Sequence, residues 1–168
     1  YALLSLVGKM VYFLGSLPMV FMVTLVSRKD GLKQSSSKIL STIFLSVFVL
    51  SLIGVVVFGV FGFLTAPLLF GPKAVDVVQW LPVYSLSIAL FTLGNVIVVY
   101  HLAKRHYLFS VVSLLISVGM VIGMWLNHDH FSDIVEVIFG ASVVSVVVFF
   151  VMHLFEASLP FIGRGLQD

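Results

Sequence analysis

The residues of this sequence that could do chemistry stand singly inside long apolar runs. Lys9 is the strongest candidate, because a cation within a membrane-spanning segment is costly and usually faces water or the interior of a helical bundle. There it could hold a phosphate or another anion electrostatically, without any bond chemistry. Lys9 also lies close to one end of its apolar run, so a second role, in which the side chain reaches out to the membrane interface, stays open.

Hydroxyl and amide side chains form stripes along several of these runs. When each residue is advanced by about 100°, the polar and small residues of the first run fall within a sector of roughly 120°. Candidate substrate-binding residues from these stripes are Lys9, Tyr12, Ser16, Tyr84, Ser85, Thr92, Asn95, Ser113 and Ser117. Such stripes either pack helix against helix, which small residues favour, or line a hydrated cavity. Gly119 and Gly123 lie opposite the serines of their run, which leaves the serine face free and favours the cavity.

The remaining polar side chains are weaker candidates for a functional site. Four neighbouring side chains are of metal-ligand type: His128, Asp129, His130 and Asp133. A solvated acidic loop explains them better than a metal site, because no further ligand or supporting shell is evident. His153 and Glu156 could relay protons, but their place at the end of an apolar run favours anchoring at the membrane interface. We expect no metal ion and no cofactor.

Signatures of soluble enzymes are missing from the sequence. It contains no phosphate-binding P-loop, no GxSxG and no HExxH. Without cysteine it has no thiol nucleophile, no disulfide and no cysteine-based metal site. The formal net charge of +2 is too small to indicate nucleic-acid binding. We therefore expect neither an enzyme nor a nucleic-acid partner.

The elements that must position the candidate residues follow from composition. Of the 168 residues, 61% are hydrophobic and 10% are charged, whereas a soluble domain carries about 25% charged residues. A helix needs about 20 apolar residues to cross roughly 30 Å of hydrocarbon. Five runs qualify, near residues 2–27, 39–65, 80–101, 106–127 and 132–156. In lipid each segment must satisfy its own backbone hydrogen bonds, so the predicted fold class is an all-α membrane protein with five transmembrane helices.

Orientation follows from the Lys and Arg residues in short loops. Seven of the nine basic residues fall in the first loop, the third loop and the C-terminal tail, and the second and fourth loops together hold only Lys73. The first and third loops and the tail, residues 159–168, are therefore predicted to be cytoplasmic. We expect residues 1–158 to form one multi-pass domain in the cell membrane. Because the chain starts with Tyr1 directly before an apolar run, we expect it to be a fragment of a longer protein.

Several stretches follow one another in a recognisable order. The segment YALLSLVGKMVYFLGSLP leads to LVSR and a basic loop, the next span ends in APLLFGP, and LPVYSLSIALFTLGNVIVVYHLAKRHYLF follows. This order resembles the polysaccharide flippases, the oligosaccharide-lipid exporters of the multidrug/oligosaccharidyl-lipid/polysaccharide superfamily. The resemblance covers nearly the whole chain, as the last five helices of a larger protein. Many relatives have a proline where this chain has Thr24, so no proline kink is expected there.

The resemblance implies an architecture and a substrate. The architecture is the C-terminal part of a two-bundle transporter whose central cavity opens alternately to each side. The substrate is a polyprenyl-diphosphate-linked oligosaccharide, exported across the cytoplasmic membrane for polysaccharide biosynthesis. Lys9 would then face the diphosphate while the lipid tail stays in the bilayer. Polysaccharide-assembly proteins are the candidate partners.

Three alternatives stay open. A cation-coupled multidrug exporter of the same superfamily would need a membrane-embedded carboxylate, and Glu136 and Glu156 lie only towards the ends of their run. A membrane-embedded glycosyltransferase or sugar polymerase would need catalytic groups in a long loop, and no convincing set is present. A structural membrane subunit would use every polar stripe for packing.

Overall fold

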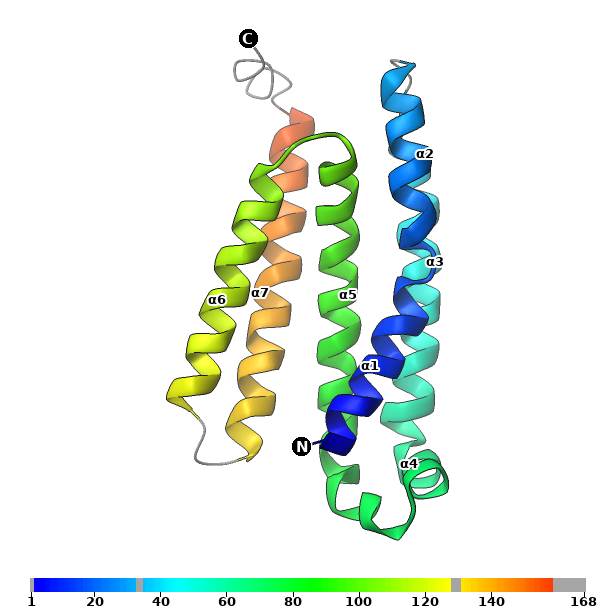
Figure 1. Cartoon of the computed structure of the whole chain (residues 1–168), viewed down its shortest axis with the longest axis vertical. Coiled ribbons are helices and arrows are strands. Elements are labelled where there is room, and N and C mark those ends of the chain that lie inside the picture. Colours follow the sequence, from blue (N-terminus) through cyan, green and yellow to red (C-terminus); the bar gives the residue numbers. More distant parts are fainter. Residues whose placement is uncertain (1, 33–34, 128–130, 159–168) are drawn as a thin grey trace.

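A computed structural model describes residues 2–32, 35–127 and 131–158 of the chain, and all of its regular structure is helical (Figure 1). The long apolar runs fold as helices because each helix satisfies its own backbone hydrogen bonds. In chain order the elements are α1 (Ala2–Ser16), α2 (Met19–Gly31), α3 (Ser37–Gly54), the π-helix η1 (Val55–Val60), α4 (Gly62–Phe70), the 3₁₀ helix η2 (Pro72–Trp80), α5 (Leu81–Ala103), α6 (Leu108–Leu126) and α7 (Phe131–Ser158).

Five of the described helical stretches are long and apolar enough to cross a membrane. They are Ala2–Lys29, Ser37–Val60, Val77–Ala103, Leu108–Leu126 and Ser132–Phe155. The predicted fold class is confirmed, and most span boundaries agree with the predicted ones within a few residues. This chain is a multi-span, all-α membrane protein.

The second span ends earlier than its apolar run predicts. It stops at Val60 rather than near residue 65, after the backbone widens into the π-helical turn η1 and bends at Phe61 (φ −90°, ψ 14°). The apolar residues that follow form α4, which turns away from the axis of α3 (Figure 1). Gly71 then ends α4 with φ 79° and ψ −179°, a backbone conformation that is essentially restricted to glycine.

The first span is one apolar run that is broken in the middle. The helix is interrupted between Ser16 and Met19, where Pro18 stands. Proline lacks the N–H of an intrahelical hydrogen bond, and its ring clashes with the preceding turn. The bend that results separates α1 from α2 while both still pack against α5 (Figure 1).

Helix α5 is the centre of the bundle. It packs against α1, α2, α3, α6 and α7, and 50% of its span is buried, compared with 6% of the α6 span. The buried apolar side chains accordingly gather around α5. The cluster between α5 and α1 includes Leu4, Val7, Leu81 and Tyr84. The cluster between α5, α2 and α3 includes Met22, Val47, Val96 and Tyr100. The cluster between α5, α6 and α7 includes Ile97, Val98, Phe109 and Phe149.

The connections alternate between the two ends of the bundle (Figure 1). The end of α2, the start of α3 and the α5–α6 connection lie at one end, called here the basic end, and these segments contain Arg28, Lys29, Lys38, Lys104 and Arg105. The N-terminus, η2 and the start of α7 lie at the opposite end (Figure 1). This separation of basic residues to one end agrees with the arrangement predicted from the loops. The tail, residues 159–168, lies outside the described residues.

Candidate functional site

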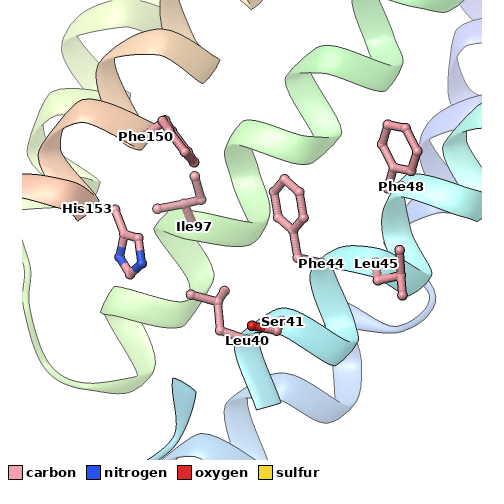
Figure 2. Close-up of a pocket in the computed structure, with 8 residues that line it drawn as sticks. All are labelled: Leu40, Ser41, Phe44, Leu45, Phe48, Ile97, Phe150 and His153. Atoms are coloured by element: carbon pink, nitrogen blue, oxygen red, sulfur yellow. The ribbon is translucent and has the colours of Figure 1, made fainter. Parts of the chain in front are cut away.

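A groove of about 490 Å³ runs between α3 and α7, with α5 between them (Figure 2). Its largest wall is one face of α3, formed by Leu40, Ser41, Phe44, Leu45 and Phe48. These positions recur every three or four residues and therefore share one side of the helix. Ile97 of α5 lies between this wall and the Phe150 and His153 side chains of α7.

The groove is apolar along its length and polar towards one end. Its polar side chains are Ser41, in the second turn of α3, and His153, within the last two turns of α7, and these two helix ends lie towards the basic end (Figure 1). All of its other lining side chains are apolar: four Leu or Phe side chains of α3, Ile97 of α5 and Phe150 of α7. A long apolar chain with a polar head would match this distribution, because the chain could lie along the wall while the head reaches the histidine.

The histidine at the end of the groove has a partner on the neighbouring helix. Nδ1 of His153 lies 3.0 Å from Nε2 of His101 on α5, within hydrogen-bonding distance. His101 is only 2% exposed, and its ring stacks on Phe109 of α6 with a centroid separation of 3.7 Å and an interplanar angle of 2°. The pair thus connects α5, α6 and α7 at the basic end.

Further polar contacts join other elements to α5 at the same end. The hydroxyl groups of Ser36 and Tyr100 lie 3.0 Å apart, which ties the residue before α3 to α5. The Ser27 hydroxyl donates a hydrogen bond to the Ala103 carbonyl at 3.3 Å, which ties α2 to α5. Nζ of Lys104 lies 4.8 Å from the centre of the Tyr100 ring, at a distance typical of a cation–π contact. The basic end is therefore the most polar contact region described between the helices.

Three of the predicted site residues lie buried within helix contacts of α5. They are Tyr84, Ser85 and Thr92, each no more than 5% exposed. The Ser85 hydroxyl donates to the Pro82 carbonyl at 3.1 Å and the Thr92 hydroxyl to the Ile88 carbonyl at 2.6 Å. The hydroxyl groups of Ser85 and Thr92 are thus satisfied within α5 itself, as is usual for serine and threonine in membrane helices.

The predicted site residues of α1 divide between two faces. Tyr12 faces α5, where its hydroxyl accepts a hydrogen bond from Nδ2 of Asn95 at 3.3 Å. The Ser16 hydroxyl donates to the Phe13 carbonyl of its own helix at 3.1 Å. Lys9 lies on the exposed face of α1. Asn95 and Tyr12 are thus two predicted residues from different helices that the fold brings into direct polar contact.

Ser113 and Ser117 belong to a separate region. Both are half-buried on α6, and the Ser117 hydroxyl donates to the Ser113 carbonyl at 2.9 Å. Helix α6 packs on α7 and α5, so these serines lie apart from the α1 residues. Of the two nearby glycines, Gly123 faces Val137 of α7 and Gly119 has open space beside it.

The metal-ligand residue types do not form a centre among the described side chains. No three of the described His, Cys, Asp or Glu side chains are placed to hold one metal ion. His128, Asp129 and His130 lie outside the described residues, as does the side chain of Glu156. The interpretation of the region near residue 130 as an acidic loop stays a prediction.

Sequence reasoning did not identify the groove or His101. A groove between α3 and α7 depends on which helices flank α5, and hydropathy contains no such information. A signal for the histidine pair was nevertheless present, because His101 and His153 both stand at the ends of spans that point to the basic end. Equal depth in the membrane makes two residues candidates for contact.

Comparisons of the chain with protein-family models, with curated proteins and with solved structures give no match. What the five spans establish is a multi-span membrane protein, and the chemistry of the groove is the basis for its proposed function.

Proposed function

We propose that this chain is part of an exporter that moves a lipid-linked oligosaccharide of the polyprenyl-diphosphate type across the cytoplasmic membrane. The observation that carries the proposal is the groove of about 490 Å³ between α3 and α7, which is apolar along its length and ends at His153. An isoprenoid tail fits an apolar groove on a membrane protein, and a polar head group fits its polar end. The sequence resemblance to polysaccharide flippases supports the same substrate.

The alternating-access architecture belongs to this proposal. In it the five helices form the C-terminal part of a two-bundle transporter, and the basic end faces the cytoplasm together with the C-terminus. Lys9 stands on the exposed face of α1 and not in the groove, so a neighbouring bundle would cover it, and its ammonium group would meet the diphosphate after the head group has left the polar end of the groove. Transport needs no covalent chemistry, and the exported sugar would pass to polysaccharide-assembly proteins.

The acidic residues favour this function over a cation-coupled multidrug exporter. Such an exporter needs a carboxylate near the middle of the membrane to bind the coupling cation. The described acidic side chains within spans are Asp133 and Glu136, both in the first two turns of α7. A purely structural subunit is disfavoured as well, because packing alone requires no groove that ends in a histidine.

The test is transport by the full-length protein in a strain that lacks its own flippase. Delivery of lipid-linked sugar to the outer leaflet is measured for the parent protein and for Leu45→Gln and Phe48→Gln, which place an amide in the groove. We expect these variants to reduce delivery about tenfold or more, because an unpaired amide in an apolar site costs on the order of 2 kcal/mol.

The matched control is Val49→Gln on the same helix. Val49 is 47% exposed and Phe48 is 45% exposed, but Val49 does not line the groove. We expect Val49→Gln to deliver at the parent level, and equal losses at Val49 and Phe48 would argue against the groove. Absence of delivery by the parent protein would remove the flippase proposal, and full delivery by Lys9→Ala would remove only the phosphate role of Lys9.

A further inference from the structure

The contact between His101 and His153 has a chemistry of its own. Nε2 of His101 and Nδ1 of His153 are 3.0 Å apart. A hydrogen bond between two imidazoles needs one nitrogen that carries a proton and one that does not. The contact can therefore exist when the pair has no added proton, or one. It cannot exist when both rings are protonated, because all four ring nitrogens are then donors.

The two histidines are held with unequal firmness. His101 is buried on α5 and stacks flat on Phe109 of α6, so its ring is fixed from a second side. His153 is half-buried on α7 and faces the groove. Of the two rings, His153 is therefore the less enclosed one, and it lies beside the groove.

The groups around the pair oppose a second positive charge. Lys104 directly follows α5, with its ammonium group over the Tyr100 ring. The ring centre of Tyr100 lies 6.1 Å from that of His153, and the ring centre of His106, in the α5–α6 connection, lies 6.0 Å from that of His101. Like charges repel strongly where the surroundings exclude water.

Neighbouring elements complete the surroundings of the pair. Helix α3 presents Leu40, Ser41 and Phe44 along the groove beside His153. Residue Glu156 follows one turn later on α7, and its side chain lies outside the described part of the chain. The described titratable and charged groups near the pair are therefore Tyr100, Lys104 and His106.

We propose that the His101–His153 pair is a proton-binding site that holds α5 and α7 together at the basic end, and that protonation of both rings releases this contact. Release changes the groove directly, because His153 and Phe150 form its α7 side and Ile97 of α5 lies beside them (Figure 2). The site would make groove opening depend on protons from the side that the basic end faces. Its role as the coupling site of export rests on the proposed function, whereas proton binding and helix separation do not.

The test measures the distance between α5 and α7 as a function of pH. These 168 residues contain no cysteine, so Leu102→Cys on α5 and Val151→Cys on α7, both at exposed positions, provide sites for two spin labels in the full-length protein, freed of any other cysteine, in nanodiscs. Between pH 8 and pH 3, a range that extends below the usual titration of histidine because burial and the neighbouring positive groups oppose the second charge, we expect the mean distance to increase by about 2 Å or more, the scale of helix shifts at packed interfaces.

Two variants of the pair and one neighbour separate the proposal from a general effect of acid. Glutamine offers a donor and an acceptor but does not titrate, so His153→Gln and His101→Gln should keep the short distance at both pH values. His106→Gln should still lengthen the distance in acid, because His106 is adjacent to the pair but not part of the hydrogen bond. Circular dichroism shows whether each variant is folded. If one of the two pair variants does not fold, the other one alone provides the comparison.

The outcomes are decisive in both directions. A parent distance that does not change with pH, or a change that persists in both pair variants, would overturn the proton-binding site. A pH-dependent distance that both pair variants abolish supports it, even if the delivery assay finds no transport of lipid-linked sugar. Conversely, delivery with a pH-independent distance would preserve the flippase and remove this coupling site.

Discussion

Gly8 of α1 lies directly against the ring of Tyr84 on α5. A methyl group at Gly8 would meet Cε1 of Tyr84 at 2.6 Å and its hydroxyl oxygen at 2.9 Å. The ring is almost fully buried and cannot move aside without disturbing other contacts. Small residues in membrane helices permit such close approach of two backbones, and Gly8 therefore decides how closely α1 packs on α5.

Gly8→Ala is expected to destabilise the folded bundle by roughly 1–3 kcal/mol, the usual cost of overpacking. Gly140→Ala on α7 is the matched control, since nothing lies within 4 Å of a methyl group there. The free energy of unfolding is measured in mixed micelles by titration with sodium dodecyl sulfate. Equal stabilities of the two variants would show that α1 and α5 are not packed through this glycine.

At the scale of elements, the segment after α3 shows how an apolar run is divided. The π-helical turn η1, the bend at Phe61 and the short helix α4 replace a continuation of the span. Gly59 of η1 packs against Ser85 and Pro82 of α5, and Gly71 reverses the chain towards η2 with φ 79°. The end of this span is thus determined by backbone geometry and glycine contacts, not by hydropathy.

Gly71→Ala is expected to reduce the free energy of unfolding by about 1–3 kcal/mol, because residues with a β-carbon rarely adopt this backbone conformation. Free space surrounds the position, so backbone strain is the cause and steric overlap is not. Gly119→Ala, in the middle of α6 with open space beside it, should show no loss in the same measurement. An unchanged stability of Gly71→Ala would mean that α4 and η2 are connected differently.

The molecule as a whole is built around α5, and its charges are divided between its two ends. The helices on either side of α5 leave the groove between α3 and α7, and the basic connections collect beside its polar end. Basic residues in short loops are retained in the cytoplasm during insertion. We therefore expect the basic end, with the polar end of the groove and the histidine pair, to face the cytoplasm.

Single cysteines test this orientation. Asn127→Cys, at the end of α6 away from the basic end, should react with a membrane-impermeant maleimide added to intact cells. Tyr107→Cys, in the α5–α6 connection at an exposed position, should react only after the cells are made permeable. The opposite result would show that the predicted orientation is wrong and that the histidine pair lies on the outer side of the membrane.

The sequence by itself determined the class of the protein, the number of its spans and the end at which its basic residues gather. These properties depend on the solvent: apolar runs of this length are stable in lipid only as helices, and charges are kept out of it. Helical periodicity also indicated that Ser85 and Thr92 share a face with Asn95. It contained no information about which helix covers that face.

Only the tertiary structure decided how these faces are used. Ser85 and Thr92 are buried in helix contacts of α5 and bond to carbonyls of their own helix, whereas Asn95 reaches Tyr12 across the α1 contact. The pairing of His101 with His153 joins residues 52 positions apart, and the groove exists because α3 and α7 flank α5. Such contacts arise from the packing of distant helices, which local propensity and hydropathy do not specify.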